Sequence, residues 1–219
     1  MKYGESAFDI LYLLFTIVSG IVILRRQTRP AHRLMGLAAL ILGLGDAFHL
    51  VPRVLNYFAP GDFTAALGLG KLVTSLTMTV FYVLLYYVWL RQYGAHENRK
   101  QTSVVWILAV LRAALCLFPQ NRWLENGGDV FWGVLRNIPF VALGACIVVL
   151  YYRARKRSAA LCRVWIYITL SFLFYIPVAV AASLVPMLGM LMLPKTVCYV
   201  LMIFAFLRQV ASDRRERPA

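Results

Sequence analysis

Long apolar runs separated by short polar segments make up most of the chain. An α-helix needs about 20 apolar residues to cross a bilayer core of roughly 30 Å. Seven runs approach this length, at residues 6–25, 34–57, 67–90, 103–119, 131–152, 159–185 and 187–208. The pattern predicts an all-α polytopic membrane protein, with seven transmembrane helices in a single domain over residues 1–219.

The composition supports the same class. Hydrophobic residues make up 61% and charged residues 15% of the 219 positions, and the mean hydropathy is +0.71. A soluble domain carries more charge than this. The connecting segments are too short for a soluble catalytic domain, so we expect any chemistry inside the bundle. Lys2, Glu5 and Asp9 lie at the start of the first run and Arg25 and Arg26 at its end. This charge order is the reverse of a signal peptide, so we expect this run to be retained.

The net charge of +14 follows the predicted topology. Sixteen of the 23 Lys and Arg residues follow the first, third, fifth and seventh runs, at residues 25–33, 91–100, 153–163 and 208–217. Seven spans place these segments on one side, which the positive-inside rule makes cytoplasmic. We therefore predict an outer N-terminus and a cytoplasmic C-terminus. Because topology accounts for the charge, nucleic acid is not an expected partner.

Ionisable side chains inside the apolar runs are the main functional signal. A charge at the centre of a membrane helix costs about 2.5 to 3.5 kcal/mol, so such residues mark a site or an internal pair. The set comprises the cations Arg53, Lys71, Arg112, Arg136 and Lys195, the carboxylate Asp46 and the imidazole His49. One carboxylate cannot neutralise five cations. The excess predicts an outward-facing pocket for an anionic small molecule, an amphiphile or a lipid head group.

The second run has the polar face expected of a pocket wall. Asp46, His49 and Arg53 lie within about 60° of one another on a helix, and Gly45 permits close helix packing. Neighbouring runs contribute further polar positions. The predicted ligand-binding set is Arg53, Lys71, Arg112, Arg136, Asn137, Lys195 and Tyr199.

Structural interpretations compete with this hypothesis. Arg53 and Lys71 are close enough to helix ends to extend toward lipid head groups. Arg112 and Lys195 lie deeper, where internal pairing is the alternative to ligand binding. Segment 121–129 mixes Asn, Gly and Trp, as a turn or lid does, and a plain interfacial loop is the simpler expectation.

A weak similarity at an offset near 125 is compatible with a 3+1+3 internal repeat. Residues 20–25 are similar to 145–150, and residues 70–74 to 194–198. In architecture the chain resembles the seven-helix class that contains the SWEET and PQ-loop carriers and the opsins, although Pro119-Gln120 lies outside the position that PQ-loop carriers use. A carrier that translocates its ligand is therefore one form of the hypothesis.

An enzyme is the main alternative. Asp46 and His49 could form an acid/base pair, with a basic residue stabilising an oxyanion. The Gly45-Asp46 step resembles the Gly-Asp motif of the lysoplasmalogenase family, which implies an intramembrane lipid hydrolase or transferase. Lys195 resembles in position the retinal-binding lysine of opsins, which implies an opsin-like alternative. The third run offers no carboxylate counterion for that alternative.

No metal and no cofactor is expected. The cysteines lack metal-ligand spacing, and His49 is the one histidine within a run, whereas zinc hydrolases of the ceramidase type need several. None of the Asn residues begins a glycosylation sequon, which favours a multi-pass protein of a bacterial inner membrane. Membrane lipid is an expected partner.

Overall fold

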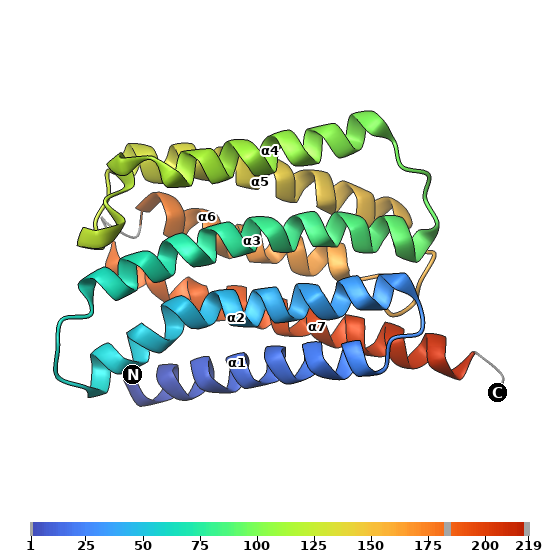
Figure 1. Ribbon diagram of the computed structural model, residues 1–219, viewed down its shortest axis with the longest axis horizontal. Coiled ribbons are helices and arrows are strands. Elements are labelled where there is room, and N and C mark those ends of the chain that lie inside the picture. The colour runs from blue at the N-terminus through green and yellow to red at the C-terminus, as the bar shows by residue number, and fades with distance from the viewer. Residues whose placement is uncertain (1, 182–184, 217–219) are drawn as a thin grey trace.

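The computed structural model describes residues 2–181 and 185–216 and shows helices that run along one common direction (Figure 1). Every regular element in these ranges is helical, which confirms the all-α prediction. The α-helices are α1 (Lys2–Arg25), α2 (Pro30–Phe58), α3 (Thr64–Tyr93), α4 (Arg99–Leu117), α5 (Val130–Ala154), α6 (Val164–Ala181) and α7 (Met192–Arg215). Short 3-10 helices are η1 (Pro119–Asn121), η2 (Trp123–Glu125) and η3 (Pro186–Leu191).

Six helical segments are long and apolar enough to cross a membrane. They are α1 to α5 and the segment Met187–Arg215, which combines most of η3 with α7. α6 is a shorter apolar helix. The protein is therefore a helical, multi-pass membrane protein.

The last two helices differ from their predicted bounds. α6 begins at Val164 and not at 159, because the Ser158 hydroxyl accepts a hydrogen bond from the Leu161 N–H at 3.2 Å and stabilises a turn. Its predicted end at 185 is wrong, since Val185 is not helical, and residues 182–184 lie outside the described ranges. The predicted run 187–208 begins as 3-10 helix, and α7 starts at Met192 and continues to Arg215.

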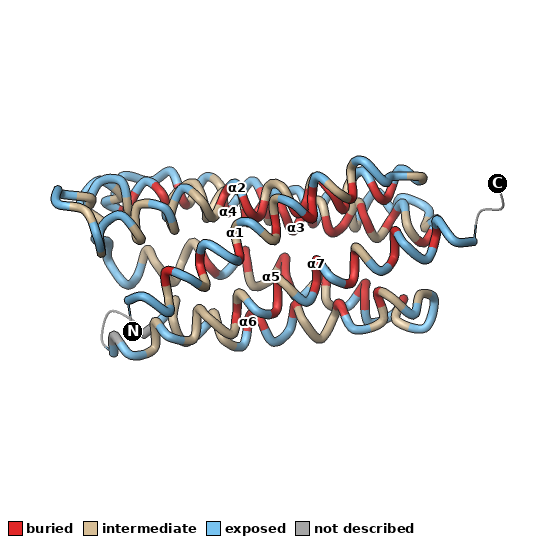
Figure 2. Tube along the Cα trace, turned by 90° about the horizontal axis from the view of Figure 1, so that it is seen from below, coloured by how far each residue is buried: buried red, intermediate tan, exposed pale blue. Residues whose placement is uncertain are grey.

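The helices define two ends of the bundle (Figure 1). The basic end holds residues 25–30, 93–99, 154–164 and 208–216, and the N-terminal end holds residue 2 and residues 58–64, 117–130 and 185–192. Buried positions of α2 all lie between Ala31 and Gly45, and most of those of α3 lie between Met78 and Tyr93 (Figure 2). The core is therefore filled mainly in the half nearer the basic end.

Glycines bring α2 and α3 into close contact beside the less filled half. The Thr74 hydroxyl donates a hydrogen bond to the Gly45 carbonyl at 3.1 Å. A Cβ at Gly70 would overlap the Phe48 carbonyl and the His49 Cα. The absence of a side chain at Gly70 lets the two backbones approach. This approach places His49 beside the first turns of α3.

Candidate functional site

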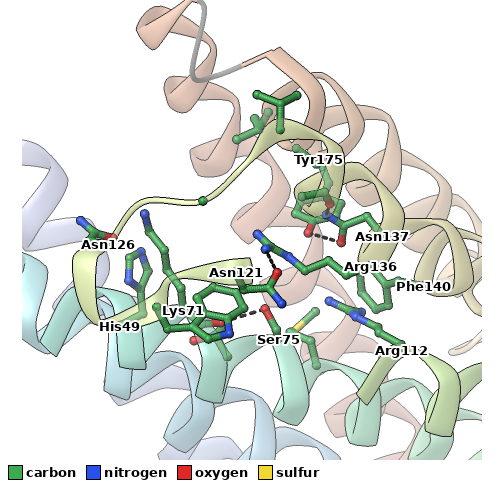
Figure 3. Close-up of a pocket in the computed structure, with 18 of the residues that line it drawn as sticks. His49, Lys71, Ser75, Arg112, Asn121, Asn126, Arg136, Asn137, Phe140 and Tyr175 are labelled. Atoms are coloured by element: carbon green, nitrogen blue, oxygen red, sulfur yellow. Dashed lines mark hydrogen bonds between the residues drawn. The ribbon is translucent and has the colours of Figure 1, made fainter. Parts of the chain in front are cut away.

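A cavity of about 360 Å³ lies at the N-terminal end of the bundle (Figure 3). Its walls come from α2 to α7 and from the segment between α4 and α5. The structure brings together in its lining the predicted residues His49, Lys71, Arg112, Arg136, Asn137 and Lys195. These residues belong to five different helices, so helix packing alone makes them neighbours.

Three predicted residues lie outside this lining, namely Asp46, Arg53 and Tyr199. Asp46 accepts a hydrogen bond from the Tyr12 hydroxyl of α1 at 2.6 Å, and Arg53 pairs with Glu5 of α1. Because Asp46 and His49 differ by about 60° around α2, the first contacts α1 while the second lies against α3. This corrects the expectation that Asp46, His49 and Arg53 form one wall of the pocket.

Arg112 is a cation buried at the cavity wall, and it is 2% exposed. Its guanidinium carbon lies 3.3 Å from the centre of the Phe140 ring. Its Nε and Nη1 atoms have no hydrogen-bond partner among the described residues. Buried charges normally have a counterion or a full set of hydrogen bonds. Arg112 therefore has donors without a partner beside the cavity, and a guanidinium matches the geometry of a carboxylate or phosphate.

Lys195 lies in the first turn of α7 and is 8% exposed. Its Nζ lies 4.7 Å from the centre of the Tyr175 ring and 5.5 Å from that of Tyr199. Tyr199 thus supports Lys195 without lining the cavity. No described carboxylate forms an ion pair with Lys195. Contacts with aromatic faces offset only part of the cost of burying an ammonium group.

Arg136 is held by the segment between α4 and α5. Its Nη1 donates a hydrogen bond to Asn121 Oδ1 at 2.5 Å, and its guanidinium carbon lies 4.5 Å from the Trp123 ring centre. Asn121 is fixed in turn, because its Nδ2 donates to backbone carbonyls near the end of α4. These contacts use only part of the donor capacity of Arg136. The remaining N–H groups can bind a ligand.

Asn137 orients a neighbouring ring. Its Oδ1 accepts a hydrogen bond from the Tyr175 hydroxyl at 2.7 Å, and its Nδ2 donates to the Gly133 carbonyl at 2.8 Å. With both ends of its amide engaged, Asn137 is better suited to positioning Tyr175 than to contacting a ligand. Since Tyr175 packs against Lys195, Asn137 influences the site through that contact.

The cavity lining carries an excess of positive charge. Four lining residues have basic side chains, namely Lys71, Arg112, Arg136 and Lys195. Asp129 is the one acidic lining residue in the described part of the chain, and it accepts the Phe131 N–H at the start of α5 at 3.1 Å. None of the four cations is paired with a described carboxylate. A partly enclosed positive cavity of this kind concentrates small anions.

Aromatic side chains close the cavity toward the basic end. The Phe140 ring centre lies 5.1 Å from that of Tyr82 and 5.0 Å from that of Phe172. The rings of Tyr82 and Phe172 are 5.4 Å apart, and Tyr82 is fully buried. Because Tyr82 lies one helical turn beyond the lining residue Met78, the cavity ends at this cluster. The arrangement suits a binding pocket with one entrance.

Segment 121–129 forms a wall of the cavity and is not a plain interfacial loop. Asn121, Trp123, Asn126 and Asp129 all line the cavity. A Cβ at Gly68 of α3 would overlap the Trp123 carbonyl and lie 3.2 Å from the Asn126 Cα. The segment therefore packs directly on the backbone of α3.

Replacing Gly68 by alanine is expected to displace this segment and expose it to protease. The added methyl group overlaps backbone and not a flexible side chain, so Trp123 must move. We expect trypsin to cleave after Arg122 several times faster in the variant, measured on intact protein in nanodiscs. Gly133→Ala is the matched control, since nothing lies within 4 Å of its Cβ position. Equal cleavage rates in Gly68→Ala and the wild type would contradict the packing.

Sequence patterns singled out segment 121–129 but did not identify Asn121, Trp123 or Phe140 as residues of the site. Asn121 follows the end of α4 closely, and an amide side chain there can satisfy the last carbonyls of a helix. That position is the one sequence signal for its role. Trp123 and Phe140 carry no comparable signal, because tryptophan and phenylalanine are common throughout membrane helices and their interfaces.

The chain matches no protein-family model, no curated protein and no solved structure. Within residues 2–181 and 185–216, no three His, Cys, Asp or Glu side chains gather into a group that could hold a metal ion. The geometry and charge of the cavity therefore carry the functional argument.

Proposed function

We propose that this integral membrane protein binds a small anionic or amphiphilic ligand in the cavity at its N-terminal end. The observation that carries the proposal is Arg112, a guanidinium that is 2% exposed, has unpartnered donors and lies at a cavity wall. Lys195 and Arg136 add positive charge at the same cavity. A bound anion would supply the counterion that Arg112 lacks among the described residues.

The ligand chemistry follows from the two kinds of lining. A carboxylate or phosphate matches the planar fork of Arg112, while Lys195 acts as a point charge. Phe140, Tyr175 and Met78 provide an apolar section beside them. A cavity of about 360 Å³ is at the small end of the range for ligand sites. A compact anion with a short apolar part fits this mixture.

The proposal includes a single domain of seven spans with α6 as the sixth, an outer N-terminus and a cytoplasmic C-terminus. An α-helix of 18 residues is about 27 Å long, close to the thickness of the hydrocarbon core. The gathering of Arg and Lys at the basic end supports this orientation. In a bacterial inner membrane the cavity would then open to the outside. The triplets α1–α3 and α5–α7 run in the same directions, as a parallel repeat requires.

Ligand binding is better supported than catalysis or transport across the membrane. Asp46 is engaged by Tyr12 and lies outside the cavity lining that contains His49, so the proposed acid/base pair has no shared site. The aromatic cluster of Phe140, Tyr82 and Phe172 closes the route toward the basic end. Translocation would require these rings to separate, and flux of a labelled anion in proteoliposomes tests for it.

Replacing Lys195 by glutamine is expected to release a bound anion. Native mass spectrometry with lipidomics, on protein extracted gently from its membrane, should show an anionic species on the wild type. Loss of one charge-assisted contact of about 1.5 to 3 kcal/mol should weaken its binding roughly tenfold to a hundredfold. Arg53→Gln is the control, because Arg53 is also a cation inside a helix but pairs with Glu5 away from the cavity. Equal retention of the anion by the wild type and Lys195→Gln, or no anionic species on either, would contradict the proposal.

A further inference from the structure

A second cavity, of about 710 Å³, lies at the basic end of the bundle between the last turns of α1 and α7. The two helices are far apart in sequence but run side by side there (Figure 1). Four arginines line this cavity, namely Arg26, Arg208, Arg214 and Arg215. The cavity belongs to a different end of the molecule from the candidate ligand site and shares no residue with it.

The remaining lining of this second cavity is mainly apolar. Val22 and Phe204 lie on facing helices toward the middle of the bundle, and Leu207 lies beside them. Phe204 is 48% exposed, and its ring centre lies 4.8 Å from that of Phe15 of α1. The two helices therefore meet just beyond the cavity and leave an apolar groove that is open to the surroundings of the bundle. Guanidinium groups lie at the outer end of this groove, and apolar side chains of the protein line its length.

Some of the other cations at the basic end have partners within the protein. Arg29 pairs with Asp213 at 3.3 Å, and Arg157 donates a hydrogen bond to the Tyr93 carbonyl at 2.7 Å. Arg155 lies over the Tyr152 ring, with 3.8 Å between its guanidinium carbon and the ring centre. In the described ranges, the side chains of the four cavity arginines have no such hydrogen bond or ion pair. Their convergence on one cavity is more than the general excess of charge at a membrane face requires.

We infer that this second cavity binds an anionic phospholipid of the surrounding membrane. The phosphate would be held by the arginine side chains, which match its geometry with bidentate hydrogen bonds. One acyl chain would lie along Val22, Phe204 and Leu207. Basic pockets between helices at a membrane surface favour anionic over zwitterionic head groups. The inference does not depend on the ligand proposed for the first cavity.

A buried hydrogen-bond network holds the α7 side of this second cavity in place. Asp213, which precedes Arg214, is 3% exposed and accepts a hydrogen bond from Gln209 Nε2 at 3.0 Å. Its other oxygen lies 2.8 Å from His32 Nε2 of α2. The end of α7 is thus anchored to α2 before any lipid binds. Such preorganisation reduces the conformational entropy that binding would otherwise lose.

The test compares lipid binding by the wild type and by the double variant Arg26→Gln/Arg214→Gln. Native mass spectrometry in detergent would count phosphatidylglycerol and phosphatidylcholine bound at equal concentrations. The wild type should retain phosphatidylglycerol preferentially, and the double variant should bind it about 30-fold more weakly. Arg99→Gln/Lys100→Gln is the matched control, because it removes the same charge from the basic end at a place outside the cavity. The control should bind phosphatidylglycerol as the wild type does.

Three results would overturn the inference. They are equal binding of the two lipids by the wild type, an equal loss in the control variant, and full displacement of the lipid by inorganic phosphate alone. A second measurement avoids dependence on the folding of the double variant. A phosphatidylglycerol with a photoreactive acyl chain should cross-link the wild type within residues 204–211 or 22–26, and cross-links confined to other helices would also overturn the inference.

Discussion

Replacing Arg112 by methionine is expected to raise the stability of the ligand-free protein while greatly weakening anion binding. The guanidinium is buried, and two of its nitrogens have no partner among the described residues. Folding therefore removes this charge from water without enough interactions to offset the desolvation cost. Exchanging buried charges for apolar side chains of similar volume often stabilises a protein by about 1 to 4 kcal/mol. Loss of the charge-assisted contact should weaken anion binding by about a hundredfold. If Arg112 had only a structural role, its replacement would lower both the stability and the anion binding.

Thermal unfolding by tryptophan fluorescence, on protein washed free of bound anions, measures the first effect. A gain of this size corresponds to a melting temperature higher by roughly 2 to 4 °C for each kcal/mol. Arg136→Met is the informative control, because it leaves Asn121 Oδ1 without its donor and should lower the melting temperature. If Arg112→Met melts below the wild type, Arg112 is structural and the argument for the cavity loses its main support.

Replacing Asp213 by alanine is expected to destabilise the basic end by on the order of 3 kcal/mol. The Thr28 N–H donates to His32 Nδ1 at 3.2 Å, which leaves the His32 Nε2 to donate to Asp213 at 2.8 Å. Asp213 also accepts from Gln209 at 3.0 Å and pairs with Arg29 at 3.3 Å. His32 is 0% exposed. Removal of the carboxylate therefore leaves buried donors on both α2 and α7 without an acceptor.

The loss should appear as a melting temperature lower by roughly 6 to 12 °C and as faster amide hydrogen exchange at the end of α7 and the start of α2. Glu97→Gln is the control, since Glu97 is an exposed acid at the same end whose contact is with the Thr102 hydroxyl. Because water stabilises exposed groups directly, that change should leave the melting temperature within about 1 °C. An equally stable Asp213→Ala protein would show that the network does not hold the two helices together.

Several parts of the fold follow from local properties of the chain. The apolar length of α1 to α5 indicates membrane helices, because transfer from water to hydrocarbon depends on residues that are adjacent in sequence. The boundaries of α6 and α7 are harder to predict. A single hydroxyl, that of Ser158, stabilises the turn before α6, and hydropathy does not register a hydrogen bond of this kind.

Some features of the candidate site likewise follow from local sequence, and others depend on tertiary contacts. Hydropathy alone identifies Arg112 and Lys195 as cations that need a counterion, since the penalty for a charge in hydrocarbon belongs to the residue itself. It does not reveal that Tyr12 engages Asp46, or that Glu5 pairs with Arg53. Both partners come from α1, and their contacts depend on which way α2 faces.

The helical membrane class, the approximate spans and the set of cations inside them can be predicted from the amino-acid sequence, because these depend on composition within short windows. The folded arrangement is needed to see which cations line one cavity, that segment 121–129 forms its wall, and that four arginines converge between α1 and α7. Helix rotation and packing set these contacts, and they join residues far apart in the chain. A pairing energy between distant residues has no signature in the local pattern of either one.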